Sequence, residues 1–206
     1  MILYTFNTEE KFDEINKREL LNRSLLDYCV SKDVAIPENG IQILRTSMGK
    51  PEIANMEGLN FSISHTKDLF VCGIQGSNLG IDFENISLKE SLNIQDTDTM
   101  TFSKRYIGIA KRFFSEEENE YLQINGFKSF FQIWVRKEAF IKAKGTGISE
   151  GLNKFSVIEN GEFVEMIEGM HLQDINIGKY IKDTNSQLLG AYCSRLPLNL
   201  EKHIKL

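Results

Sequence analysis

The chain has 206 residues, which is enough for one large domain or two small ones. Apolar residues make up 41% and charged residues 26%, as in soluble globular proteins, so the composition excludes a disordered chain. A formal net charge of -5 argues against broad nucleic-acid binding, because that needs a basic surface. No apolar run reaches bilayer-spanning length and residues 1–7 lack the pattern of a signal peptide, so we expect a cytoplasmic protein with no membrane association.

The first hundred residues are predicted to combine one long helix with several short strands. Residues Ile2–Phe6 read as a strand, and the apolar spacing after residue 8 predicts a helix that ends near Cys29. Three further segments of strand character are separated by turn residues, and their spacing predicts an antiparallel meander. These segments are Leu59–His65, Phe70–Gln75 and Leu79–Glu84.

The second half of the chain shows a similar pattern. Lys104–Phe114 is predicted to be helical, and Ser115–Glu118 has the pattern of a capping box that begins another helix. Asn160–Gly161, between two segments of strand character, is the strongest hairpin signal in the sequence. Two more strands are predicted at Tyr180–Asp183 and Leu188–Ser194.

Each half therefore reads as a long helix packed on a small, mostly antiparallel sheet. We predict an α+β fold of two pseudo-symmetric halves, residues 1–100 and 101–206, with the active site in the cleft between them. The three cysteines lie in apolar segments and are odd in number, so we predict buried free thiols rather than disulfides or a metal cluster. They are Cys29, Cys72 and Cys193.

The segment from Phe127 to Gly145 is predicted to be the central helix. Its apolar residues recur at spacings of three, four and seven, and no proline interrupts them. Gly145 follows a lysine-rich last turn and can adopt the left-handed conformation in which many helices end. Glu138 and Lys142 lie four residues apart, close to the apolar stripe. Alone they would suggest only a surface ion pair of little energetic weight.

Two further carboxylates suggest a metal site. Asp82 and Glu84 face the same way on a predicted strand, because successive strand residues alternate between its faces. Ile81 and Phe83 then point into the core. Neighbouring carboxylates repel each other unless a cation lies between them, and Glu138 from the helix would add a third oxygen ligand. Such a site, with room left for water or phosphate, suits Mg²⁺, with Mn²⁺ as an alternative.

Four segments match the motifs of a known family in order and approximate spacing. They are Gly49–Pro51, Phe61–Thr66, Gly80–Glu84 and Trp134–Lys142. In these segments the chain resembles the larger single-chain 4'-phosphopantetheinyl transferases, the surfactin-synthetase-activating type. Each motif alone is a weak signal, but four in order argue against a chance likeness.

The resemblance implies transfer of 4'-phosphopantetheine from coenzyme A to a serine of an apo acyl or peptidyl carrier protein, with release of adenosine 3',5'-bisphosphate. It implies that Asp82, Glu84 and Glu138 hold Mg²⁺ against the pyrophosphate, and that Lys142 contacts the pyrophosphate. Such a reaction depends mostly on positioning and charge stabilisation, and Lys142 offers a point charge to a phosphate oxygen. Glu138, directly or through a metal-bound water, is our candidate for the general base.

The resemblance also assigns residues to the nucleotide end of coenzyme A. It implies that Lys50, Ser64 and His65 contact this end. Family members commonly carry a longer basic N-terminal segment that binds the 3'-phosphate, whereas seventeen residues precede Arg18 here. We carry Arg18 over as a candidate for that role.

The carrier protein is predicted to dock on an apolar patch with local cations, because carriers tend to be acidic, as this chain is. Phe113, Phe114 and the segment Gly145–Phe155 are candidates, although most phenylalanines belong to a core. We expect a monomer. Two other functions remain open, namely a metal-dependent pyrophosphate hydrolase that uses the same carboxylates and a nucleotide-binding or scaffold protein without activity.

Overall fold

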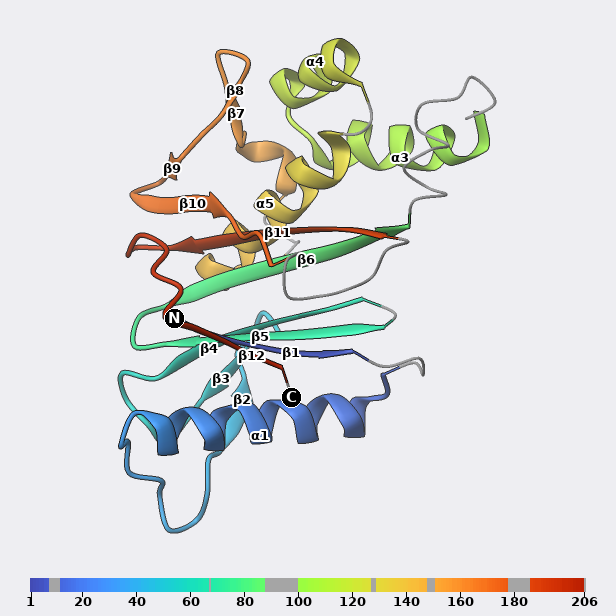
Figure 1. Ribbon diagram of the computed structural model, residues 1–206. Coiled ribbons are helices and arrows are strands. Elements are labelled where there is room, and N and C mark those ends of the chain that lie inside the picture. Colours follow the sequence, from blue (N-terminus) through green and yellow to red (C-terminus); the bar gives the residue numbers. More distant parts are fainter. Residues whose placement is uncertain are drawn as a thin grey trace.

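The computed structural model describes residues 1–7, 12–66, 68–87, 100–126, 129–147, 151–177 and 186–205. Within them the protein has a mixed α+β fold built in layers (Figure 1). Two four-stranded sheets are stacked in the middle, helix α1 (Glu14–Ser31) covers the outer face of one, and helix α5 (Phe130–Lys144) covers that of the other. Each half is a long helix on a small sheet, which confirms the predicted fold class.

The first sheet has the strand order β12-β1-β5-β4. Its neighbours are antiparallel except for β1 and β12, which run parallel. A separate two-stranded ribbon is formed by β2 and β3. The strands are β1 (Ile2–Asn7), β2 (Ile43–Arg45), β3 (Pro51–Ile53), β4 (Asn60–His65), β5 (Leu69–Gln75) and β12 (Lys202–Lys205).

The second sheet has the strand order β6-β11-β10-β9 and is antiparallel throughout. A short hairpin, β7 and β8, turns at Asn160 and Gly161, which both have positive φ, so the predicted hairpin is confirmed. The elements of this half are β6 (Leu79–Ser87), α3 (Met100–Phe113), α4 (Glu116–Asn125), the 3₁₀ turn η3 (Leu152–Lys154), β7 (Ile158–Glu159), β8 (Glu162–Phe163), β9 (Met166–Ile167), β10 (Met170–Asp174) and β11 (Ser186–Ser194).

The predicted meander of three strands is wrong at its third member. Strands β4 and β5 pair as expected, but β6 pairs with β11 of the second sheet, with Asp82 opposite Ala191 and Glu84 opposite Leu189. The chain therefore crosses from one sheet to the other at the turn between β5 and β6. Near the end of the chain, strand β12 pairs with β1 in the first sheet. Each sheet therefore contains strands from both sides of residue 100. The division of the chain into residues 1–100 and 101–206 stays a prediction. The strand predicted at Tyr180–Asp183 lies outside the described residues.

Three apolar clusters hold the layers together. One lies between α1 and the first sheet and includes Leu25 and Phe70, and another surrounds α5 and includes Phe140. The third lies between the two sheets and includes Ile81 and Phe83, which are 0% and 1% exposed, so both point into the core as predicted. Strand β6 is thereby held in place from its core side.

The ends of the helices follow their sequence signals. Helix α1 begins after Asp13, whose carboxylate accepts a hydrogen bond from the backbone of Asn16 at 2.7 Å. Ser115 and Glu118 form the predicted capping box at the start of α4. Gly145 ends α5 with a φ of 75°, the left-handed conformation expected there.

The three cysteines are buried and free, as predicted, and burial raises the pKa of each thiol. A thiol with a raised pKa carries little thiolate at neutral pH and is a poor nucleophile. In the described ranges, none of the helices combines the length and the apolar character that crossing a bilayer would demand.

Candidate active site

Strand β6 and helix α5 come into direct backbone contact at Gly80. A Cβ atom added there would lie 2.0 Å from the carbonyl oxygen of Ala139 and 2.4 Å from the backbone nitrogen of Ala143, so only glycine fits. This contact brings the carboxylate-bearing part of β6 against the turn of α5 that carries Glu138 and Lys142.

Asp82 and Lys142 form an ion pair between these two elements. The Lys142 Nζ atom lies 2.7 Å from Asp82 Oδ1 and donates a second hydrogen bond to the carbonyl oxygen of Ile63 at 3.2 Å. The Asp82 side chain is 8% exposed and that of Lys142 is 29% exposed. The pair therefore joins strand β4, strand β6 and helix α5 at one point that solvent or a ligand can reach from the lysine side.

Ser64 completes the contacts of Asp82 from strand β4. Its hydroxyl donates to Asp82 Oδ1 at 2.9 Å and accepts a hydrogen bond from the backbone nitrogen of Phe83 at 3.1 Å. Ser64 is buried, and its contacts are with β6. The nucleotide role implied for Ser64 stays a prediction, whereas its contact with a carboxylate was not foreseen.

The second oxygen of Asp82 has no hydrogen-bond partner among the described residues although it is buried. A buried carboxylate oxygen without a partner is costly, and such atoms often mark a ligand position. Glu138 on α5 is half-buried, and its pKa is raised first by burial and then by the charge of Asp82, with Lys142 acting in the opposite direction. The negative charges of Asp82 and Glu138 therefore act on each other across the contact between β6 and α5.

No three-carboxylate cluster is seen. Across the described ranges, no group of three or more histidine, cysteine, aspartate or glutamate side chains is placed to hold a metal ion. Glu84 is half-buried on the same face of β6 as Asp82, but two positions along a strand are about 6.6 Å apart. The expected meeting of Asp82, Glu84 and Glu138 around a cation stays a prediction, and in this structure the cation paired with Asp82 is the ammonium of Lys142.

Two carboxylates nevertheless fit a hard divalent cation. Mg²⁺ is commonly bound through one or two carboxylates, with substrate phosphates and water completing its shell. Asp82, with its unpartnered oxygen, and Glu138, whose pKa the charge of Asp82 raises, are two carboxylates of this kind. The place of Glu84 in such a site stays a prediction.

A cavity of about 360 Å³ opens beside this ion pair. Lys50, His65, Glu138 and Lys142, all candidates from the sequence, line it together. Burial, followed by the charges of Lys17 and Lys142, lowers the pKa of His65. His65 would therefore be mainly neutral at pH 7 in this state, and a bound anion would favour its protonated form.

Arg18 does not take part in this cavity. It is exposed on α1 and is not among the lining residues, whereas Lys17 and Arg45 are. Arg45 also donates a hydrogen bond to the carbonyl oxygen of Gly49 at 3.0 Å and so braces the loop that carries Lys50. Neither Lys17 nor Arg45 was a candidate from the sequence, because both lie outside the four motifs.

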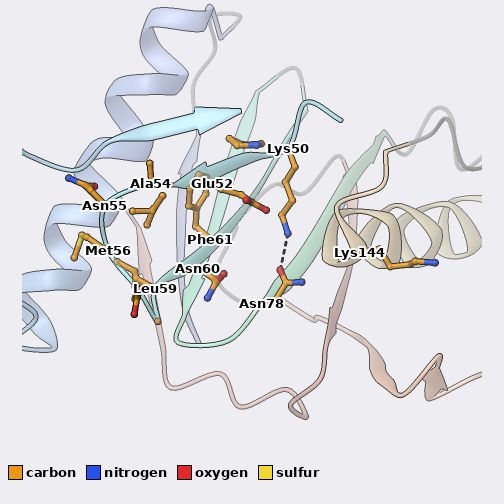
Figure 2. Close-up of a pocket in the computed structure, with 14 residues that line it drawn as sticks. Lys50, Glu52, Ala54, Asn55, Met56, Leu59, Asn60, Phe61, Asn78 and Lys144 are labelled. Carbon is orange, nitrogen blue, oxygen red and sulfur yellow. Dashed lines mark hydrogen bonds between the residues drawn. The ribbon is translucent and has the colours of Figure 1, made fainter. Parts of the chain in front are cut away.

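Lys50 also lines a second cavity, of about 560 Å³ (Figure 2). In Figure 2 its side chain reaches Asn78, and its Nζ atom donates to Asn78 Oδ1 at 2.8 Å. The amide nitrogen of Asn78 in turn donates to the carbonyl oxygen of Ala143 in the last turn of α5. Burial lowers the pKa of Lys50, with Glu52 acting in the opposite direction. Asn78 thus ties the loop of one half to the helix of the other.

A second lysine of α5 forms a different kind of ion pair. Lys137 and Glu118 are both 0% exposed, and the Lys137 Nζ atom lies 2.7 Å and 2.6 Å from the two carboxylate oxygens. Nζ also donates to the carbonyl oxygen of Phe155, and Glu118 accepts from the backbone nitrogens of Ser115 and Val157. This closed network joins α4, α5 and the segment before β7.

The proposed carrier surface is only partly exposed. Phe114 is 3% exposed and stacks on Phe130 with ring centroids 5.1 Å apart, so it belongs to the core and is not free to dock a partner. Phe113 is partly buried against Trp134. In the segment predicted with them, Leu152 is buried, and residues 148–150 lie outside the described ranges.

Comparisons with known proteins identify the family. Residues 78–184 match the model of the 4'-phosphopantetheinyl transferase superfamily, which is more than half of the chain. The chain belongs to this superfamily. Residues 8–75 match a second model, described as the N-terminal part of 4'-phosphopantetheinyl transferases. The resemblance drawn from the four motifs is thereby confirmed.

Several curated transferases are similar to the chain. The 4'-phosphopantetheinyl transferase psf-1 of Bacillus pumilus is 29% identical over 196 residues, covering 92% of this chain and 76% of the relative. The transferase gsp of Aneurinibacillus migulanus is 32% identical over 147 residues, which is 69% of this chain and 54% of the relative. The transferase Sfp of Bacillus subtilis strain 168 is 31% identical over 147 residues, 68% and 57% respectively. The matched region thus spans little more than half the length of the last two relatives.

Proposed function

We propose that the protein transfers 4'-phosphopantetheine from coenzyme A to a serine of an apo acyl or peptidyl carrier protein and releases adenosine 3',5'-bisphosphate. One observation carries the proposal for this chain. In the Asp82–Lys142 pair one carboxylate oxygen of Asp82 has no partner among the described residues, and Lys142 lines a cavity together with Glu138 and further cations. Membership of the transferase superfamily supports the same conclusion.

The cations of the 360 Å³ cavity would bind the phosphates of coenzyme A. Lys50, Lys17, Arg45 and His65 provide positive charge or hydrogen-bond donors on one side. Lys142 lies on the other side and would stabilise the charge that develops on the pyrophosphate as its bond breaks. The Lys142 side chain lines the cavity and is 29% exposed, so a phosphate in the cavity can approach it.

Asp82 and Glu138, with Glu84 as a further candidate, would hold Mg²⁺ or Mn²⁺. When bound, the ion neutralises pyrophosphate charge and orients the phosphate for attack. Asp82 is suited to this role because Ser64 and Lys142 occupy only one of its two oxygens.

The carrier serine must lose its proton when its oxygen attacks the phosphorus that bears the pantetheine group. The bond from that phosphorus to the bridging oxygen breaks, and adenosine 3',5'-bisphosphate leaves with the electron pair. Glu138 is our candidate for the group that accepts the proton, because its raised pKa makes its carboxylate a stronger base than an ordinary glutamate. We place this reaction in the cytoplasm and expect a monomer to perform it.

The proposal is tested by incubating the protein with coenzyme A, Mg²⁺ and a panel of apo carrier proteins and measuring intact carrier mass and released nucleotide. We expect one carrier or more to gain a phosphopantetheine group, with one adenosine 3',5'-bisphosphate released per carrier modified. Release of that nucleotide without any carrier would instead indicate a pyrophosphate hydrolase. Coenzyme A binding without either product would indicate a binding protein.

A further inference from the structure

The open edge of strand β6 is covered by two serine hydroxyls from strand β4. Strand β6 is the edge of its sheet, so on the side away from β11 its backbone N–H groups have no strand partner. Ser62 Oγ accepts from the backbone nitrogen of Ile81 at 3.0 Å, and Ser64 Oγ accepts from that of Phe83 at 3.1 Å. The two serines are 6% and 4% exposed. Each serine therefore satisfies one backbone N–H group at the edge of the sheet.

Only Ser64 also contacts a carboxylate. Its hydroxyl donates to Asp82 Oδ1 at 2.9 Å, with the carbonyl oxygen of Phe83 as a more distant alternative at 3.3 Å. Because the N–H of Phe83 donates to the Ser64 oxygen, the hydroxyl hydrogen points elsewhere, and the ionised carboxylate can only accept it. The bond to Asp82 is therefore charge-assisted and directional.

The two oxygens of Asp82 differ as a result. Oδ1 accepts from Ser64 and from Lys142, whereas Oδ2 is buried and has no partner within the described ranges. A carboxylate fixed through one oxygen cannot rotate freely to satisfy the other. Ser64 itself does not line the 360 Å³ cavity, whereas Ser62, Ile63 and His65 do.

We propose that Ser64 is a positioning residue that acts through Asp82: its hydroxyl fixes the carboxylate by Oδ1 and thereby holds Oδ2 ready for a divalent cation. This inference rests on the proposed function, because it takes Asp82 to be a ligand of that cation. It differs from a direct contact of Ser64 with coenzyme A, which is what the resemblance to the transferases implies.

The test compares Ser64→Ala with Ser62→Ala, which loses the matching contact with β6 but no contact with Asp82. Coenzyme A binding is measured by calorimetry without a carrier, once with Mg²⁺ and once with EDTA. We expect Ser64→Ala to weaken the Mg²⁺-dependent binding about tenfold relative to Ser62→Ala, as for the loss of one hydrogen bond to a charged group. Binding in EDTA should be the same for Ser64→Ala as for wild type, so that removing Mg²⁺ abolishes the effect of this substitution. Ser62→Ala, whose side chain lines the cavity, should change binding by the same factor with Mg²⁺ and with EDTA. The urea midpoint should fall at least as far in Ser64→Ala as in Ser62→Ala, because Ser64 has the additional bond to Asp82.

A third variant, Ser64→Cys, keeps a weaker donor of similar size and should bind between wild type and Ser64→Ala. Equal Mg²⁺-dependent binding by Ser64→Ala and Ser62→Ala would overturn the inference. A tenfold loss that is also seen in EDTA would overturn it in favour of direct contact with coenzyme A. Wild-type protein that binds coenzyme A with Mg²⁺ but modifies no carrier would refute the proposed transfer and leave this comparison of serines intact.

Discussion

Two of the lysines of helix α5, Lys137 and Lys142, form ion pairs that differ in one decisive respect. The Lys137–Glu118 pair is fully enclosed, and each carboxylate oxygen of Glu118 has more than one donor. The Lys142–Asp82 pair lies at a cavity, and one of its carboxylate oxygens has no partner in the part of the chain that the structure describes. A saturated pair can only support the fold, whereas an unsaturated pair can still bind a ligand.

The largest effect is expected when the negative charge of the enclosed Lys137–Glu118 pair is removed. Glu118→Gln leaves the buried ammonium of Lys137 without a counter-charge, and we expect the free energy of unfolding to fall by about 3–5 kcal/mol. Urea denaturation followed by circular dichroism measures it. Burial lowers the pKa of Lys137, so the variant should recover some stability as the pH is raised and Lys137 loses its proton. A loss below about 1 kcal/mol would show that the enclosed pair does not hold this half together.

Loss of the backbone contact at Gly80 should disturb the Lys142–Asp82 pair more than the Lys137–Glu118 pair, because the contact joins β6 to α5. In Gly80→Ala the new methyl group meets the backbone of α5, and we expect a loss of about 1–3 kcal/mol in unfolding free energy as β6 moves away. Coenzyme A binding should weaken with it. Gly108→Ala in α3 is the control, because a Cβ there meets no atom within 4 Å, and it should stabilise slightly. Equal stability of the two variants would contradict the close packing.

Asn78 links Lys50 to the last turn of α5, and its replacement shows whether this link contributes to nucleotide binding. Asn78→Ala frees Lys50 from its amide partner, and we expect the Michaelis constant for coenzyme A to rise about 3- to 10-fold with a smaller change in the turnover number. Asn60→Ala is a matched control, since Asn60 lines the same 560 Å³ cavity without contacting Lys50. If both variants behave alike, the position of Lys50 does not depend on Asn78.

The smallest expected effect is the pH dependence that Glu138 adds to stability. Its pKa in the folded protein is raised above the ordinary value of 4.5, so the folded state binds the proton more tightly than the unfolded state. Its contribution to stability is therefore lost as the pH rises from about 4.5 through the folded pKa. Without coenzyme A or metal, Glu138→Gln should gain stability relative to wild type between pH 4 and pH 7 in urea titrations. A difference that does not change with pH would mean that Glu138 is solvated.

Local structure was predictable where a short pattern fixes the backbone. The capping box at Ser115, the hairpin at Asn160–Gly161 and the glycine that ends α5 are found where the sequence predicts them. The partner of β6 was not predictable in this way, because alternation of apolar residues defines a strand but not its neighbour. The turn between β5 and β6 has the residues of a hairpin turn but carries the chain to the other sheet.

The sequence was sufficient to predict which residues belong to the candidate site, but not which of them contact one another. Lys50, His65, Glu138 and Lys142 line one cavity as the four motifs implied, but the bond between Asp82 and Lys142 depends on the contact at Gly80, which joins segments some sixty residues apart. Glycine was read there only as part of a motif. The Lys137–Glu118 pair escaped notice for a similar reason, since each residue belongs to a different helix.

If the Asp82–Lys142 pair is the site of phosphopantetheine transfer, the isosteric Asp82→Asn variant should lose the activity and keep the fold. The measurement is the intact mass of an accepted apo carrier after incubation with coenzyme A and Mg²⁺. We predict that the carrier remains unmodified over a time in which wild-type protein modifies it completely, while the unfolding free energy changes by less than about 2 kcal/mol, because Lys142 remains partly solvated. Modification at the wild-type rate by folded Asp82→Asn would contradict the account.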